Sequence, residues 1–253
     1  MRSDPPSNVP GVTETVTGAK AGAVPDRNGT VAAEQRTLIC AHRGASRGLP
    51  DNSPRSFEAA IASGCELIES DVRGDRRGRL VLAHDRVRVA ASAHSRGAVA
   101  AATIVPEPTP LPELLQLARG RIGLDLEIKE ARVVTALLEA IAGWSGPLVL
   151  TSFDPAAIRA VREQDPSRTT GLIAGPMHIG NPLTDAVVCG ADMLVLSERR
   201  ATAKLLATRR LPIWVWTVNQ PARLARWLAD PAVECVITDD PATAVAVRDG
   251  LRG

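Results

Sequence analysis

From residue 37 onward, short runs rich in Val, Ile and Leu alternate with segments whose apolar residues recur at helical spacing. This alternation constrains the fold most, because strands that alternate with helices form βαβ units with parallel strands. The predicted strands are 37–42, 66–72, 79–84, 122–128, 147–152, 170–174, 192–196, 212–218 and 234–238. The predicted helices are 54–63, 111–119, 131–142, 155–164, 199–209, 220–229 and 241–249.

This succession of units predicts an α/β fold, a (β/α)8 TIM barrel, over residues 37–253. A doubly wound open sheet is the alternative, but the sequence contains neither G-x-G-x-x-G nor G-x-x-x-x-G-K to support a nucleotide-binding sheet. Residues 1–36 are rich in Pro, Gly, Thr and Asn without periodicity, so we predict a disordered N-terminal tail. Segment 85–110, rich in alanine, is predicted to form a loop over the barrel mouth.

The runs 66–72 and 79–84 explain why the chain has one strand more than a barrel needs. Only six residues separate them, too few for a parallel crossover, so we predict a β-hairpin beside the second strand. A two-residue loop would place His84 opposite Glu69, whereas a bulge at Gly78 would shift that register by one residue. In either register the hairpin carries His84 to the level of the carboxylates on the second strand.

The bulk composition narrows the functional classes. Thirty basic residues against 28 acidic ones, with only 2% aromatic residues, argue against nucleic acid as a partner. No stretch approaches the length of a transmembrane helix, and the N-terminus lacks the continuous apolar segment of a secretory signal, so we predict a cytoplasmic location. The four cysteines form no C-x-x-C pair and are expected to be buried thiols.

Charged side chains gather on one face of two predicted strands. Because side chains alternate along a strand, Glu69 and Asp71 share one face. Asp125, Glu127 and Lys129 share one face of the next barrel strand. The apolar residues between them would face the helices, so the charged set would point into the barrel near its C-terminal rim, where such folds have their active sites.

Carboxylates this close together repel one another unless positive charge lies among them. Glu69, Asp71 and Glu127 offer the oxygen ligands that Ca2+ and Mg2+ prefer, so we predict a divalent-cation site. A structural network of ion pairs with Lys129 and Arg43 is the alternative.

Two of the four histidines, His42 and His84, reach the same rim. Their position beside a cation site suggests a general base and a general acid. His94 and His178 fall in predicted loops, where we expect them to be solvated.

The order of these residues resembles the glycerophosphodiester phosphodiesterase family, which consists of PI-PLC-like TIM-barrel enzymes. That family's pattern runs H-R-G, P-E-N-T, E-x-D, D-G, H-D, E-I-K, S-F, W-T-V-N and T-D-x-P. The matching positions are His42–Gly44, Pro50–Ser53, Glu69–Asp71, Arg77–Gly78, His84–Asp85, Glu127–Lys129, Ser152–Phe153, Trp216–Asn219 and Thr238–Pro241.

The resemblance implies a Ca2+- or Mg2+-dependent phosphodiesterase of lipid and glycerol metabolism. Its substrate would be a small glycerophosphodiester, and its products would be glycerol 3-phosphate and an alcohol. Carried over by motif, Glu69, Asp71 and Glu127 would hold the metal, His42 and His84 would be the acid/base pair, Arg43 and Lys129 would bind the phosphate, and Trp216 would line the pocket.

Two departures from the family pattern bear on the site. Asp51 stands where the family has glutamate, and its shorter side chain favours a supporting role over direct metal contact; we group Asn52 with it. The segment after His84 is shorter than in the family and would cover the leaving group. The alternatives are therefore a phospholipase-D-like enzyme acting on lysophospholipids or sphingolipids, and a catalytically weak barrel that binds a phosphate ligand.

Overall fold

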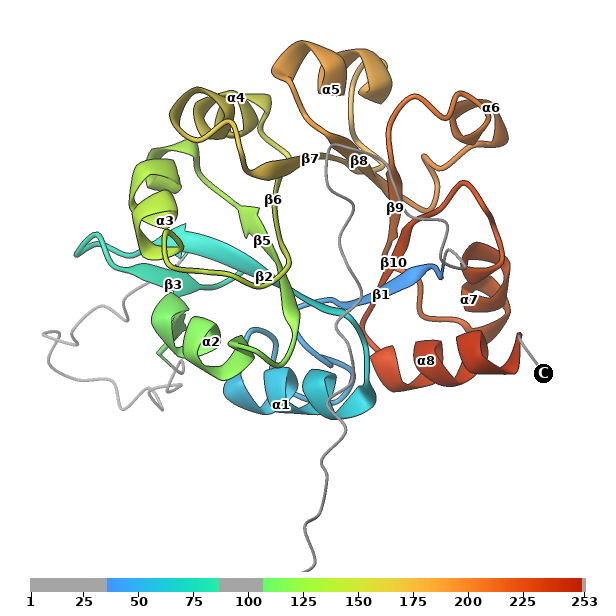
Figure 1. Cartoon of the computed structure of the whole chain (residues 1–253), viewed down its shortest axis with the longest axis horizontal. Helices are drawn as coiled ribbons and strands as arrows, with labels where there is room; N and C mark the ends of the chain where they lie inside the picture. Colours follow the sequence, from blue (N-terminus) through green and yellow to red (C-terminus); the bar gives the residue numbers. More distant parts are fainter. Residues whose placement is uncertain (1–35, 87–106, 252–253) are drawn as a thin grey trace, which may run out of the picture.

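The computed structural model describes residues 36–86 and 107–251, in which parallel strands close into a barrel surrounded by helices (Figure 1). Around the ring, the strands are β1 (Leu38–Ala41), β10 (Cys235–Thr238), β9 (Ile213–Trp216), β8 (Met193–Ser197), β7 (Thr169–Ala174), β6 (Leu148–Ser152), β5 (Gly123–Ile128) and β2 (Leu67–Gly74). Because β1 pairs with both β10 and β2, the ring of eight strands has no open edge. The predicted (β/α)8 TIM barrel is confirmed, and an open sheet is excluded.

The helices cover the outside of this ring (Figure 1). They are α1 (Pro54–Ser63), α2 (Leu111–Ala118), α3 (Val134–Ala140, preceded by the short 3-10 helix Ala131–Val133), α4 (Pro155–Gln164), α5 (Pro182–Cys189), α6 (Ala203–Leu206), α7 (Pro221–Leu228) and α8 (Pro241–Gly250). Six of them begin with a proline in the first turn, where its missing N–H breaks no helical hydrogen bond. Helix α5 is not among the predicted helices, and α6 is much shorter than the predicted 199–209.

Apolar side chains fill two layers. The larger layer lies between strands and helices and includes Ile39 and Leu124, whereas a smaller one inside the barrel includes Leu38, Cys40 and Trp214. Alternate residues of one strand thus enter different layers, as the alternation in the sequence predicts. All four cysteines are buried and free, which confirms the expectation of buried thiols.

Strand β2 pairs with two different strands, β1 and β3 (Leu80–Leu82), along the same edge. Its first residues pair in parallel with β1, and its last three pair antiparallel with β3. Strand β3 in turn pairs with the two-residue strand β4 (Thr109–Pro110). The predicted hairpin is therefore present, and it projects outward between α2 and α3 (Figure 1).

The register of this hairpin follows the bulged alternative. Val72 lies opposite Leu82, so the pairing of Glu69 with His84 that a two-residue loop would give is wrong by one residue. Gly78 adopts a φ of 78°, the left-handed conformation that such a bulge requires. The shift follows from the three-residue turn that glycine makes possible.

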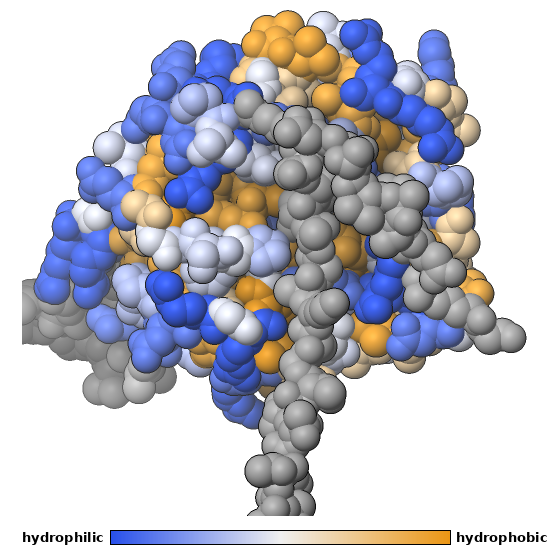
Figure 2. Space-filling model, in the orientation of Figure 1, coloured by the Kyte–Doolittle hydropathy of each residue, from blue (hydrophilic) through white to orange (hydrophobic). Residues whose placement is uncertain are grey.

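No helix in the described ranges is long and apolar enough to span a membrane. Most of the predicted tail 1–36, most of the predicted loop 85–110, and His94 lie outside the described residues. On the face drawn in Figure 2, hydrophilic side chains occupy much of the perimeter, and hydrophobic residues are visible toward the barrel axis and over α5.

Candidate active site

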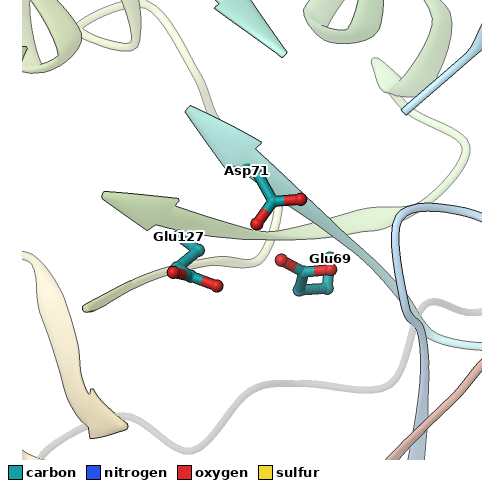
Figure 3. A group of neighbouring side chains, drawn as sticks. All are labelled: Glu69, Asp71 and Glu127. Carbon is teal, nitrogen blue, oxygen red and sulfur yellow. The ribbon is translucent and has the colours of Figure 1, made fainter. Parts of the chain in front are cut away.

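Three carboxylates from two neighbouring strands meet inside the barrel. Asp71 of β2 lies in register with Glu127 of β5, and Glu69 precedes Asp71 by two residues on the same face. One carboxylate oxygen of each residue lies within 4.8 Å of the others. The side chains point into a common space (Figure 3), and the residues are only 4%, 1% and 7% exposed for Glu69, Asp71 and Glu127. We call these three residues the carboxylate cluster.

Two cations, Arg43 and Lys129, lie against the carboxylate cluster and share Asp71. Arg43 Nε is 3.1 Å from Asp71 Oδ2, and Lys129 Nζ is 3.2 Å from Asp71 Oδ1 and 2.6 Å from Glu127 Oε1. Burial by itself raises the pKa of Asp71, but the attraction of Lys129 and Arg43 outweighs it, so this pKa is lowered. Asp71 is therefore ionised at neutral pH.

Glu69 has no cationic partner of this kind among the described residues. Its Oε2 accepts a hydrogen bond from the backbone N–H of Arg43 at 2.9 Å, but its buried Oε1 accepts none from any described residue. Burial, followed by repulsion from Asp71 and Glu127, raises the pKa of Glu69 well above its usual range. Burial also raises the pKa of Glu127, although Lys129 opposes it.

A fourth carboxylate, Asp125, lies two residues before Glu127 on β5. It is buried, it accepts a hydrogen bond from the Thr151 hydroxyl at 2.7 Å, and burial raises its pKa to about 7. When all are ionised, these four carboxylates exceed the two cations by two negative charges. Ion pairs therefore leave the site unbalanced, and buried oxygens with no donor suit a divalent cation of the Ca2+ or Mg2+ type.

The loop between β1 and α1 turns sharply to bring Arg43 to the carboxylate cluster. Arg43 and Gly44 both have left-handed backbone conformations, with φ of 55° and 81°. A Cβ at Gly44 would lie 2.5 Å from Ser56 Oγ, so only glycine fits there. Ser56 also holds the turn, because its hydroxyl donates to the Arg43 carbonyl at 2.9 Å.

Asp51 and Asn52 bind Arg43 and Asp71 rather than joining the carboxylate cluster. Asp51 Oδ2 accepts a hydrogen bond from Arg43 Nη1 at 2.8 Å. Asn52 is buried; its Nδ2 donates to Asp71 Oδ2 at 2.9 Å, and its Oδ1 accepts from the Ser70 hydroxyl at 2.6 Å. This geometry agrees with a supporting role for both residues, and the short side chain of Asp51 suffices to reach the guanidinium.

His42 is held by a carboxylate from the end of the last barrel strand. Its Nδ1 lies 2.6 Å from Oδ1 of Asp239, whose Oδ2 accepts a hydrogen bond from Asn219 at 2.5 Å. Burial tends to raise the pKa of Asp239, but the hydrogen bond and charge of His42 lower it overall. Because the acceptor is ionised, Nδ1 of His42 carries a proton and Nε2 is left for chemistry. When it is protonated, His42 also opposes the burial that raises the pKa of Glu127.

Sequence reasoning gave Asp239 no role, although a signal for it exists. The two partners are 197 residues apart in the chain. Barrel closure pairs Ala41 with Thr238, so the residues that follow them must be neighbours at the rim. A prediction that the barrel closes therefore also predicts that His42 and Asp239 are neighbours.

His84 follows β3 by two residues, and its imidazole is 47% exposed, with Nδ1 3.0 Å from Asp85 Oδ1. Its charge is among those that lower the pKa of Asp71, so it lies within electrostatic range of the carboxylate cluster. The expectation that His178 is solvated is wrong. That side chain is 14% exposed, and its Nε2 lies 2.8 Å from Asp185 Oδ2.

Two aromatic rings, Trp216 and Phe153, pack against each other near Lys129. Trp216 donates from Nε1 to the Val195 carbonyl at 3.2 Å, and its ring meets Phe153 edge to face with a centroid separation of 5.6 Å. Lys129 Nζ lies 5.7 Å from the Phe153 ring centroid. In the sequence, Phe153 was only part of a matched motif. In the structure, its ring lies near Lys129, the residue that pairs with Glu127.

A polar cleft of about 480 Å³ opens beside His42. Arg43, Arg47, Gln220 and Asp239 are among the residues that line it. These side chains offer both donors and acceptors, so the cleft suits a group that bears hydroxyls.

Comparison with known proteins agrees with this geometry. The sequence profile of the glycerophosphoryl diester phosphodiesterase family matches residues 42–106 and 121–243. The chain belongs to the glycerophosphoryl diester phosphodiesterase family. The match includes the carboxylate cluster, both rim histidines and Asp239, so the family assignment and the site rest on the same residues.

Some relatives of this chain align over nearly their whole length. It is 26% identical over 246 residues to the glycerophosphodiester phosphodiesterase of Caldanaerobacter subterraneus subsp. tengcongensis, covering 85% of this chain and 99% of the relative. A glycerophosphodiester phosphodiesterase structure from Parabacteroides distasonis is similar with a TM-score of 0.71 at 19% identity, covering 87% of this chain and 100% of that one. A phosphodiesterase from Oleispira antarctica, solved with the product sn-glycerol-3-phosphate, gives a TM-score of 0.70 at 18% identity, covering 85% and 97%. The two structures support the barrel fold.

Proposed function

We propose that the chain hydrolyses glycerophosphodiesters to glycerol 3-phosphate and an alcohol. The observation that carries the proposal is the position of His42, which Asp239 orients at a rim shared with a buried carboxylate cluster and its flanking cations. Family membership, and a relative solved with sn-glycerol-3-phosphate, support the same substrate class.

The cations of the site suit an anionic substrate. A phosphodiester repels nucleophiles, and positive charge offsets the negative charge that grows in the transition state. Arg43 and Lys129 contact Asp71 from two sides and therefore flank a phosphate that approaches the carboxylate cluster. Glu69, Asp71 and Glu127 would hold a divalent cation, which would supply Lewis-acid chemistry to the site.

We assign the proton transfers to His42 and His84. As the attacking oxygen forms its bond to phosphorus, one histidine takes its proton. As the bond from phosphorus to the leaving oxygen breaks, the other histidine protonates that oxygen, so the alcohol departs neutral. The attacking group is water, or the neighbouring hydroxyl of the substrate's glycerol, in which case water then opens a cyclic phosphate.

The test is the release of glycerol 3-phosphate from several glycerophosphodiesters, with and without EDTA. We expect release to stop in EDTA and to return when Ca2+ or Mg2+ is added in excess. Full activity in EDTA would contradict the metal proposal. No release from any glycerophosphodiester, with metal supplied, would contradict the proposed reaction.

Cation binding should stabilise the protein more strongly as the pH rises. The pKa values of Glu69 and Glu127 are raised in the metal-free fold, and that of Asp125 is raised to about 7. The folded protein therefore keeps protons on these carboxyl groups that the unfolded chain releases near the ordinary carboxyl pKa of about 4. Between those values the folded state binds more protons than the unfolded state, so the stability of the metal-free protein falls as the pH rises. A cation offsets the charges that appear.

Thermal unfolding measures this effect. At one fixed cation concentration, about 100 times the Kd at pH 8, the midpoint should rise by several degrees at about pH 8 and by less at about pH 5. An equal rise at both pH values, or none, would contradict a cation site built on these carboxylates.

Exposed hydrophobic side chains favour a second substrate class. In this class, one of the two groups esterified to the phosphate carries an acyl chain, as in a lysophospholipid. Phe153 is 45% exposed beside the site, and the loop after β7 exposes Met177 and Ile179 by 89% and 93%. Burying each of the two loop residues against an acyl chain contributes about 1.5–3 kcal/mol. The variant carrying Met177→Ser and Ile179→Ser should therefore lower kcat/KM for lysophosphatidylcholine at least about tenfold and leave glycerophosphocholine unaffected. Equal effects on the two substrates would remove this candidate.

We also propose a cytoplasmic location. The four cysteines are buried free thiols, which suits a reducing compartment. Fractionation of cells that express the chain tests the location, and recovery outside the cytoplasm would contradict it.

A further inference from the structure

Arg73 lies on β2 two residues beyond Asp71, and the proposed reaction gives it no task. Its side chain is only 13% exposed. Its Nε is 3.2 Å from the Ala83 carbonyl and 3.0 Å from the His84 carbonyl, and its Nη2 donates to the His84 carbonyl at 2.8 Å. Its remaining donor, Nη1, binds Glu130 Oε1 at 2.9 Å. One guanidinium thus holds the backbone on which His84 is mounted.

Glu130 is itself fixed from the other side. Arg132 contacts Glu130 Oε2 and donates from Nη2 to the Gly74 carbonyl at 3.0 Å. A Cβ at Gly74 would lie 2.9 Å from Arg132 Nη1, so glycine leaves room for this arginine. We call Arg73, Glu130 and Arg132 the arginine clamp; it joins the ends of β2, β3 and β5.

The arginine clamp is needed because little else restrains His84. The last backbone hydrogen bond of the hairpin runs from Ala83 N–H to the Asp71 carbonyl at 2.9 Å. Among the described residues, the His84 ring pairs only with Asp85, whose side chain is 96% exposed. An exposed ring on an unpaired backbone would sample many positions, whereas two hydrogen bonds from a charged donor fix its carbonyl.

The arginine clamp also links His84 to the end of β5. Glu130 directly follows Lys129 at the end of β5, the strand that carries Glu127. The end of the hairpin is therefore joined to the strand that carries Glu127, a member of the carboxylate cluster. The same strand end carries Lys129, which we propose binds the phosphate. Catalysis depends steeply on such distances, because a displacement of about 1 Å can lower a rate about 100-fold.

From these contacts we infer that Arg73 is a positioning residue, which sets the place of the His84 imidazole relative to the carboxylate cluster. The inference rests on the proposed function, in which His84 transfers a proton. It assigns Arg73 no contact with the substrate. Loss of Arg73 should therefore change kcat far more than KM.

A double-mutant cycle tests this inference. Arg73→Met should lower kcat for glycerophosphocholine by about 10- to 100-fold and change KM by less than about threefold. In a His84→Ala background the same substitution should lower kcat no further, because both changes remove one function. Arg73→Lys, which keeps a single charged donor, should retain more activity than Arg73→Met.

Arg79→Met is the matched control, since Arg79 lies on the same hairpin and pairs with a carboxylate, Asp75, but is 59% exposed at the turn. It should leave kcat unchanged. Equal losses from Arg73→Met in both backgrounds would overturn the inference, and if that variant fails to fold, Arg73→Lys is judged by the same cycle. A large effect of His84→Ala with none from Arg73→Met would overturn the inference alone. No effect of His84→Ala would overturn the proton-transfer assignment as well.

Discussion

Replacing His42 by alanine should lower kcat for glycerophosphodiester hydrolysis by about 10³-fold, within the range for loss of a general acid or base. A collapse of the barrel would not be the cause of this loss. The backbone N–H of His42 donates to the Thr238 carbonyl at 2.8 Å, so the pairing of β1 with β10 survives the substitution. What disappears is the ring whose Nδ1 is bound by Asp239. Asp239→Asn should lose less, because the ring stays while its ionised acceptor is lost.

The chain offers a matched control for this experiment. His178 is also a largely buried histidine on a carboxylate, Asp185, but neither residue belongs to the carboxylate cluster. His178→Ala should leave kcat within about twofold of the unchanged enzyme, as for substitutions outside an active site. Glycerol 3-phosphate release, measured at saturating substrate, is the readout for both variants. Full activity in His42→Ala would remove His42 from the proposed reaction.

Replacing Glu69 by glutamine should abolish most activity and yet stabilise the metal-free protein. Glu69 is the member of the carboxylate cluster whose Oε1 has no donor among the described residues. Glutamine keeps an oxygen for the Arg43 N–H and removes a charge that burial and two neighbouring carboxylates disfavour. Without that charge the cation site loses a ligand, and kcat should fall by about 10²- to 10³-fold.

Thermal unfolding in EDTA and in excess Ca2+ or Mg2+ separates the two effects. Glu69→Gln should raise the midpoint in EDTA at about pH 8, because a carboxyl whose pKa is raised in the folded state costs stability at pH values above its ordinary pKa. The same variant should shrink the rise that the cation produces. Glu66→Gln is the contrasting control, because Glu66 is bound by Arg248 at 2.8 Å and by Arg36 at 2.6 Å at the opposite end of the strand. That variant should keep the cation response, because Glu66 is not part of the carboxylate cluster. A lower midpoint for Glu69→Gln in EDTA would contradict the unbalanced charge of the site.

The barrel and the carboxylate cluster were predictable from sequence because they depend on local periodicity. A strand that alternates every second residue places Glu69 and Asp71 on one face whatever the rest of the chain does. The register of the hairpin was less certain, since it depends on the turn at Gly78, which can hold two residues or three. Asp239 lay outside local reasoning altogether, because its contact with His42 exists only once the ring is closed.

The helices show where periodicity fails. Helix α5 is short and carries apolar residues around most of its circumference, so its pattern does not stand out from a strand or a loop. Asn181, which caps it, and Pro182 at its start were the available signals. In the predicted helix 199–209, only Ala203–Leu206 are helical, and turns precede and follow them.

The contact between the first and last strands makes the order of synthesis matter for activity. The carboxylate cluster comes from β2 and β5, which are complete by about the midpoint of the chain. The partner that orients His42 arrives only with Asp239, just before the last helix. A partly made or truncated chain can therefore hold the pieces of a cation site without an oriented histidine. In the proposed reaction, hydrolysis therefore requires that the first and last barrel strands have paired, so an activity measurement would also report closure of the barrel.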